Sequence, residues 1–328
     1  MGINGFMKNM RQDNPDIKKR NYESVYIDCN YLLHYFIYNC KNDDDLYQKT
    51  YNYLKYLFKT INITHQIHLI FDGMHPHHLQ QINPKKQTQE QRTKYKKESA
   101  DYDKQLIAPK MKIVTTFKTH LIDSINSLKK IYKTQFEIII NDDSVDDEAD
   151  FKILNGIYES NFKNICIISR DSDMILIAYS LICKKKINIE ILSNLRPIMF
   201  IDVVELNKGY NLDYVLIILL LGNDYLPKLS NVDYDTIINT YNQYLKHENS
   251  PILTNNNINY NNFINYLTYI ILNKKIKLNF KNIDCFRFEK YYNNILWCLK
   301  KYKVIDNENN YTEDTNNVIN IYNFIYSH

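Results

Sequence analysis

The most constraining feature of this chain is an alternation of short β-branched runs with longer stretches of helical periodicity. Strands are expected at residues 24–28, 65–71, 136–140, 164–169, 187–192 and 198–201. Strands separated by helices favour βαβ units, in which neighbouring strands run parallel. The sequence therefore predicts an α/β fold with a mostly parallel central sheet flanked by helices.

Acidic residues stand where these expected strands end. Asp28 follows SVYI, Asp72 follows HLIF, and a further pair of aspartates follows ICIISR. The complete set consists of Asp28, Asp72, Glu148, Asp150, Asp171, Asp173 and Asp224. Because the carboxyl ends of parallel strands meet at one edge of a sheet, we expect these side chains to gather in one cleft.

So many carboxylates in one cleft would repel one another unless cations were bound between them. Hard oxygen ligands select Mg²⁺ or Mn²⁺, and a site of this size suits two ions. Such clusters commonly serve phosphoryl chemistry. The residues alone therefore predict a metal-dependent nuclease, with the seven carboxylates as its catalytic and metal-binding groups.

The charge distribution fits a polyanionic substrate. The formal net charge is +4, and lysine-rich runs occur at residues 18–20, 94–97 and 184–186. A basic surface around an acidic cleft attracts a polyanion and directs one phosphate to the metal. Taken singly, each lysine run is more typical of a solvated helix face.

The remaining composition predicts an intracellular protein without membrane segments. Six cysteines occur without a Cys-x-x-Cys pair, which is typical of reduced thiols. The sequence contains no apolar run of about 20 residues and no signal-peptide core at its start. We expect a cytoplasmic monomer, from a virus or from an A/T-rich cellular genome.

The pattern along the chain suggests two regions. Residues 1–250 contain the strands and the acidic residues, and within them the polar segment 80–112 is expected to form an exposed arm or a cover over the cleft. Residues 251–328 have a helical, tyrosine-rich pattern and form a predicted C-terminal extension.

Several motifs in order along the chain resemble the Xrn-type 5′→3′ exoribonucleases. They read MGINGFMKNMRQDNP, YIDCNYLLHY, FDG, DDEADFKIL, ISRDSDMILIA and LLLGNDYLPKL. The resemblance extends from Met1 to about Leu267 and covers the first conserved region of that family. The family is a branch of the superfamily that includes the flap endonucleases and PIN-like nucleases.

The resemblance implies roles for individual residues. The metal-binding carboxylates would be the same seven that the strand ends indicate, and His34 would pack against the first nucleotide. A basic pocket for the 5′-phosphate would contain Lys85, Lys86, Gln91, Arg92 and Lys94. The implied substrate is single-stranded RNA with a 5′-monophosphate, such as a decapped messenger, and decapping factors would be the implied partners.

The sequence departs from the family pattern in three places. A Gly-Glu-Gly-Glu-His motif is replaced by residues 147–151, Asp-Glu-Ala-Asp-Phe, and a Gly-Leu-Asp-Ala-Asp motif by residues 169–173, Ser-Arg-Asp-Ser-Asp. Both replacements keep two metal-binding acids. The family's second conserved region, which contributes to the substrate channel, is not part of this sequence, so processivity is not predicted.

Two alternatives remain open from the sequence. A flap-endonuclease-like enzyme acting on branched DNA would need a glycine-rich turn that holds duplex phosphates, but no glycine follows Gly222. A catalytically silent RNA-binding scaffold would be expected to have lost several metal carboxylates, whereas all seven positions are acidic.

Overall fold

The computed structural model describes residues 3, 19–37, 40–73, 110–142, 144, 147–195, 198–206, 211–223, 225–226, 228–229, 232–254, 257–273, 285–306 and 318–319. The chain divides into two compact units. The sheet unit comprises residues 12–170 and 187–202, and the helical unit comprises residues 1–11, 171–186 and 203–328. The sequence-based division at residue 250 remains a prediction, and the predicted arm lies, apart from the first residues of α7, outside the described residues.

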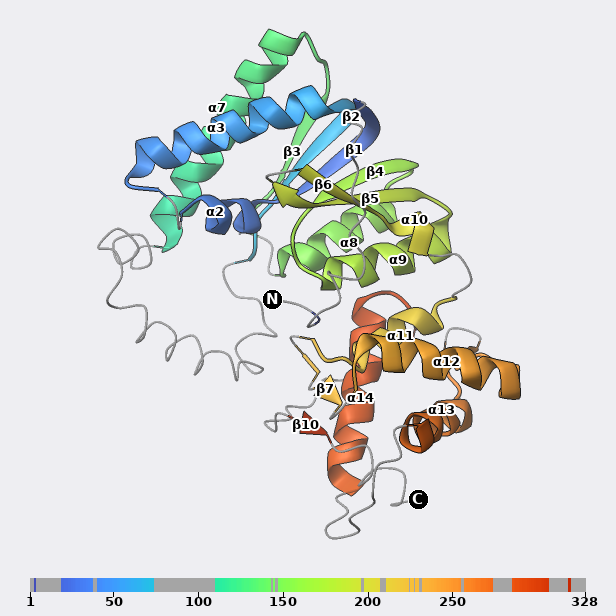
Figure 1. The fold of residues 1–328 in the computed structure, drawn as a ribbon. Coiled ribbons are helices and arrows are strands. Elements are labelled where there is room, and N and C mark those ends of the chain that lie inside the picture. Colours follow the sequence, from blue (N-terminus) through green and yellow to red (C-terminus); the bar gives the residue numbers. More distant parts are fainter. Residues whose placement is uncertain are drawn as a thin grey trace. The chain divides into compact units, whose positions relative to one another are not determined.

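A mixed, mostly parallel sheet forms the centre of the sheet unit (Figure 1). Its described strands follow the order β3-β2-β1-β4-β5-β6. They are β1 (Arg20–Asp28), β2 (Ile61–Ile70), β3 (Glu137–Asn141), β4 (Asn164–Ile168), β5 (Asn188–Leu195) and β6 (Ile198–Asp202). All neighbours pair in parallel except β6, which runs antiparallel to β5. The predicted fold class is confirmed.

Helices cover both faces of this sheet (Figure 1). The helices are α2 (Cys29–Ile37), α3 (Asp43–Thr60) and α7 (Lys110–Tyr132) on one face and α8 (Ala149–Glu159) on the other. The alternation along β1 explains both layers, because Val25 and Ile27 enter the core with α2, α3 and α7, whereas Tyr26 faces Gly156 of α8.

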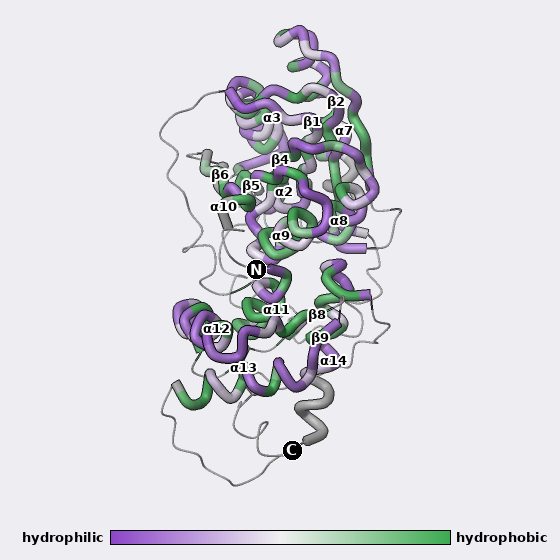
Figure 2. The backbone as a smooth tube through the Cα atoms, turned by 90° about the vertical axis from the view of Figure 1, so that its right-hand side faces the viewer, coloured by the Kyte–Doolittle hydropathy of each residue, from purple (hydrophilic) through white to green (hydrophobic). Residues whose placement is uncertain are grey.

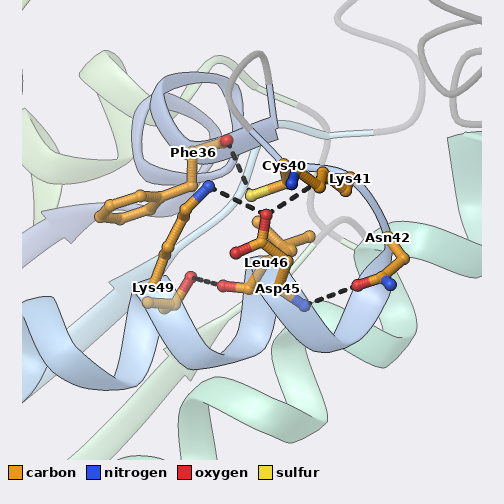
Figure 3. A network of polar contacts seen from close by, with 8 residues as sticks. Phe36, Cys40, Lys41, Asn42, Asp45, Leu46 and Lys49 are labelled. Atoms are coloured by element: carbon orange, nitrogen blue, oxygen red, sulfur yellow. Dashed lines mark hydrogen bonds and ion pairs between the residues drawn. The ribbon is translucent and has the colours of Figure 1, made fainter.

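A polar network fixes the junction between α2 and α3 (Figure 3). Asn42 is the N-cap of α3, and its side chain accepts a 2.9 Å hydrogen bond from the Asp45 amide. Asp45 accepts hydrogen bonds from the Lys49 ammonium at 2.9 Å and the Lys41 amide at 3.0 Å, and these bonds lower the pKa of its carboxyl group. The Cys40 thiol donates to the Phe36 carbonyl at 3.0 Å. The end of α2 is thereby held against the start of α3.

The helical unit is built from segments that precede β5 and follow β6 in the sequence. Its helices are α9 (Asp173–Lys185), α10 (Val203–Leu206), α11 (Asp213–Leu219), α12 (Tyr234–Glu248), α13 (Tyr260–Asn273) and α14 (Cys285–Lys301). Short strands pair as β7 (Lys228–Leu229) with β10 (Val318–Ile319), and β8 (Leu253–Thr254) with β9 (Asn257–Ile258).

The apolar helix α11 forms the centre of this unit, where it contacts α9, α12 and α14. Every residue of α11 is buried, and so are the first ten residues of α9. In Figure 2, α11 is largely hydrophobic along its length, whereas α12 is largely hydrophilic. No helix in the described part of the chain is long and apolar enough to cross a lipid bilayer.

Candidate active site

Asp28 is the last residue of β1, and the chain enters α2 directly after it. Its side chain is 8% exposed. One carboxylate oxygen, Oδ1, accepts a 2.9 Å hydrogen bond from the Tyr31 amide in the first turn of α2, and Oδ2 accepts a 3.2 Å bond from the Ser169 hydroxyl. Both donors are neutral, so they orient the carboxylate without cancelling its charge.

Asp72 stands two residues beyond the end of β2, and Asp28 pairs in register with Ile70 on that strand. Oδ1 of Asp72 accepts a 2.8 Å hydrogen bond from the amide of Ala149, and Oδ2 accepts one from the Asn30 side chain. The Gly73 amide in turn donates to the Asp147 carbonyl at 2.8 Å. Asp72 therefore connects the start of α2 with the start of α8.

Glu148 and Asp150 lie at the beginning of α8. Glu148 is the N-cap residue, yet its side chain forms no capping hydrogen bond with the helix. Asp150 lies in the first turn, where the positive end of the helix dipole favours a carboxylate. Because Asp72 binds the amide of Ala149, between these two acids, the structure brings Glu148 and Asp150 to the same edge of the sheet as Asp72.

Lys152, also on α8, binds backbone carbonyl groups next to this edge. Its side chain is buried, and its ammonium group donates to the carbonyl of Phe71 at 2.7 Å and to the carbonyl of Asp142 at 2.8 Å. The Asp142 carboxylate forms a 2.6 Å ion pair with the ammonium group of Lys118 on α7, and this contact lowers the pKa of Asp142. Asp142, which is not among the seven predicted metal-binding acids, is thus engaged in a structural contact.

Asp171 and Asp173 belong to the helical unit. Asp171 Oδ1 accepts a 3.2 Å hydrogen bond from the Asp173 amide, which shapes the entry into α9. Between them, the Ser172 hydroxyl bonds to both backbone groups of Ile3: it accepts from the amide and donates to the carbonyl at 3.4 Å. Ile3 is therefore attached to the residue between the two aspartates.

Asp173 is the first residue of α9 and is 5% exposed. Its Oδ2 accepts a 3.0 Å hydrogen bond from the hydroxyl of Tyr302, just after α14. Burial raises the pKa of Tyr302 well above its ordinary value, so this phenol stays protonated and donates its hydrogen. Sequence reasoning assigned no chemistry to the C-terminal region and missed this contact.

The other predicted site residues divide into one that is described and six that are not. His34 is exposed on α2. The residues that lie outside the described part of the chain are Lys85, Lys86, Gln91, Arg92, Lys94 and Asp224. Their roles remain predictions.

The donor chemistry of these residues fits a hard divalent cation. Asp28, Asp72, Glu148 and Asp150 offer carboxylate oxygens at one edge of the sheet, and neutral donors hold two of them in place. Within the described residues, no three His, Cys, Asp or Glu side chains are already gathered closely enough to hold an ion. The convergence of all seven carboxylates therefore stays a prediction.

Comparison with known proteins identifies the family. A mostly parallel sheet with carboxylates at the ends of its strands defines an α/β protein of the kind that binds ligands at that edge of the sheet. The family model described as "XRN 5′-3′ exonuclease N-terminus" matches residues 1–194, more than half of the chain. The chain belongs to the XRN 5′-3′ exonuclease family, and it is a 5′-3′ nuclease.

Comparison with solved structures found two kinds of similar protein. The catalytic core of Rad2 in complex with a DNA substrate is 14% identical with a TM-score of 0.44, over 91% of this chain and 83% of that one. The bacteriophage T5 flap endonuclease with DNA and metal ions is 12% identical with a TM-score of 0.38, over 87% of this chain and 100% of that one. A search of curated protein sequences found no match.

Proposed function

We propose that this protein is a divalent-metal-dependent 5′→3′ exoribonuclease that degrades single-stranded RNA with a 5′-monophosphate. The observation that carries the proposal is the placement of Asp28 and Asp72 at the ends of adjacent parallel strands, with Asp72 bonded to the amide between Glu148 and Asp150. The proposal takes this edge as part of the metal site that the resemblance to the Xrn-type enzymes implies.

Seven residues would hold the metal ions: Asp28, Asp72, Glu148, Asp150, Asp171, Asp173 and Asp224. Mg²⁺ or Mn²⁺ bound there would supply an activated water and stabilise the leaving oxygen of the phosphodiester. The protein's own contribution is to fix the carboxylates. Neutral donors such as the Tyr31 amide, the Ser169 hydroxyl and the Ala149 amide orient the oxygens before substrate binds.

The other predicted residues would position the RNA. His34, exposed on α2, would stack on the first nucleotide. Lys85, Lys86, Gln91, Arg92 and Lys94 would bind the 5′-phosphate through charge-assisted hydrogen bonds. A pocket matched to a monophosphate excludes a capped end, so the substrates would be decapped or internally cleaved transcripts. The protein would act on RNA after decapping factors have removed the cap, and it would work as a cytoplasmic monomer.

The test is degradation of one short sequence supplied as RNA and as DNA. Each is offered with 5′-monophosphate, 5′-hydroxyl or capped ends in Mg²⁺, and products are followed over time. We expect loss of the 5′-monophosphorylated RNA alone, through nucleotide-by-nucleotide shortening from the 5′ end. The double variant Asp171→Asn/Asp173→Asn should be inactive.

Asp142→Asn is the matched control for that variant. Asp142 is also acidic and follows a strand of the sheet, but its carboxylate is engaged with Lys118 and Ser144. Activity per folded molecule should therefore remain at the wild-type level. Cleavage of branched DNA in preference to RNA would assign the protein to the flap endonuclease type, and inertness toward every substrate would indicate a binding scaffold.

A further inference from the structure

The hydroxyl group of Tyr302 joins the predicted metal-binding carboxylate of Asp173 to the side chain of Asn223. It donates a 3.0 Å hydrogen bond to Asp173 Oδ2 and accepts a 3.1 Å bond from the side-chain amide of Asn223. All three residues belong to the helical unit. Tyr302 is 1% exposed and Asp173 is 5% exposed, so these bonds form away from solvent.

Asn223 uses its other side-chain atom to shape the turn that follows it. Asn223 Oδ1 accepts hydrogen bonds from the Tyr225 amide at 2.9 Å and the Leu226 amide at 2.7 Å. The Asn223 amide donates to the Leu226 carbonyl at 3.0 Å and closes the turn. Asp224 is the residue between Asn223 and Tyr225 in the sequence.

Tyr302 is itself held firmly in place. Its backbone carbonyl accepts a 2.7 Å hydrogen bond from the hydroxyl of Ser180 on α9, and its amide donates to the Cys298 carbonyl at 2.9 Å. Ser180 lies two turns beyond Asp173 on the same helix. Tyr302 is therefore fixed relative to α9 at two points: its phenol binds the Asp173 carboxylate, and its backbone carbonyl binds the Ser180 hydroxyl.

We propose that Tyr302 is a positioning residue for the nuclease reaction, because its hydroxyl binds the Asp173 carboxylate and is itself bound by the side chain of Asn223. This inference rests on the proposed function for the role of Asp173. A second layer of hydrogen bonds that orients metal ligands affects metal affinity or activity about 10- to 100-fold when it is removed. The C-terminal region, which lies beyond the matched residues 1–194, would then complete the active site.

A comparison with Tyr291 separates this role from ordinary packing. Tyr291 lies on α14 and is 2% exposed, and its hydroxyl has no hydrogen-bond partner among the described residues. Tyr291→Phe therefore removes an atom that bonds to nothing described. Tyr302→Phe keeps the ring and its packing but removes the donor to Asp173 and the acceptor for Asn223.

The experiment measures Mn²⁺ affinity by calorimetry or electron paramagnetic resonance, and kcat and KM on 5′-monophosphorylated RNA. For Tyr302→Phe we expect Mn²⁺ affinity and kcat to fall about 10- to 100-fold. KM for RNA should stay within about two-fold, because Tyr302 contacts carboxylate and amide groups and not the substrate. Tyr291→Phe should match the wild type in all three quantities.

Asn223→Asp provides a second, independent variant. It keeps the oxygen that accepts from Tyr225 and Leu226 but removes the amide that donates to Tyr302. It should lower kcat in the same direction as Tyr302→Phe, and it keeps the inference testable if Tyr302→Phe does not fold. Circular dichroism and thermal unfolding establish which variants are folded at the assay temperature.

Two outcomes would overturn the inference. One is a folded Tyr302→Phe protein with wild-type Mn²⁺ affinity and kcat. The other is a loss of kcat that is fully explained by a smaller fraction of folded protein. Such a loss would disappear at a lower temperature, at which the variant is folded. If the wild type degrades no substrate, the proposed function fails, but the Mn²⁺ affinities of the wild type, Tyr302→Phe and Tyr291→Phe still test the positioning role.

Discussion

The ammonium group of Lys152 lies 2.7 Å from the carbonyl oxygen of Phe71, the residue immediately before Asp72. A second hydrogen bond of 2.8 Å reaches the carbonyl of Asp142, just beyond β3. One buried cation on α8 therefore ties together the ends of β2 and β3. These hydrogen bonds fix the backbone at the point where it leaves the sheet. They therefore fix the main-chain position from which the Asp72 side chain extends.

Replacing Lys152 by Met should disturb both stability and metal binding. The substitution keeps a side chain of similar length but leaves two buried carbonyl groups without this donor, at a cost of about 2 kcal/mol in the free energy of unfolding. Urea titration measures that cost, and calorimetry should show weaker Mn²⁺ binding.

Lys118→Met is the control for that prediction, since Lys118 binds the side chain of Asp142 in a partly exposed ion pair. Its loss should cost only about 0.5 kcal/mol and leave Mn²⁺ binding intact. Equal effects of the two variants would show that Lys152 has no special connection with the acidic edge.

His68 should make the protein sensitive to acid. Its ring stacks on Tyr26 with centroids 4.1 Å apart, and burial lowers its pKa to about 4, against a smaller opposite effect of Glu137. The ordinary value is 6.5, so the unfolded chain binds the proton more readily than the folded one. Stability should be complete above about pH 6.5 and decline as the pH falls toward 4.

His68→Phe isolates this contribution, because phenylalanine can stack on Tyr26 but cannot titrate. Unfolding free energies measured in urea at several pH values between 4 and 7 should fall less steeply for the variant. Parallel curves for the two proteins would refute the assignment to His68.

Asp213 should be essential for the stability of the helical unit. It is fully buried at the start of α11 and accepts hydrogen bonds from the Tyr241 hydroxyl and from the amides of Ile252 and Leu253. Oδ2 accepts from Tyr241 and Ile252, and Oδ1 accepts from Leu253, so Asp213→Asn places an NH₂ group opposite at least one of these donors, which should cost about 3 kcal/mol.

Thermal and urea unfolding measure that loss. Asp235→Asn, at an exposed position in the first turn of α12, should cost no more than about 1 kcal/mol, the usual contribution of a helix-terminal charge. An Asp213 variant as stable as this control would mean that the three hydrogen bonds can be replaced.

Gly156 should tolerate no large side chain. A Cβ atom there would lie 3.0 Å from Cε1 of Tyr26, which is tighter than most Cβ contacts in proteins, so that the Tyr26 ring would have to shift by a few tenths of an ångström. Gly156→Val should destabilise the protein by about 2 kcal/mol through overpacking between α8 and β1. Asn155→Val, at the exposed neighbouring position, measures the helix-propensity cost alone, and a similar loss in both variants would contradict the packing explanation.

The sheet could be predicted because its strands depend on local patterns. Short β-branched runs mark the strands, and Asp28 and Asp72 follow two of these runs, so their places at the ends of β1 and β2 could also be derived from the sequence. The convergence of the seven carboxylates depends on contacts between distant segments and stays a prediction.

The supporting residues could not be predicted, because their roles depend on partners distant in the sequence. Lys152 lies between apolar neighbours in FKIL, and a single lysine in such a run usually reaches solvent. Tyr302 is one of 29 tyrosines, and nothing in its local sequence connects it with Asp173. One signal for Lys152 was its spacing, since it lies three residues after Ala149 and four before Gly156 and therefore shares their face of α8. Small residues let that face approach the sheet closely, which indicates that Lys152 points toward the sheet.

The distance between Asp173 and Tyr302 along the chain also sets a time order during synthesis. The two residues are 129 positions apart, and the whole of β5, β6 and α10 to α14 is translated between them. At roughly 5–20 residues per second, the ribosome needs on the order of ten seconds to cover that interval. A nascent chain therefore carries Asp173 for seconds before its hydrogen-bond partner exists, and the growing polypeptide passes through a stage in which this carboxylate is present without that support.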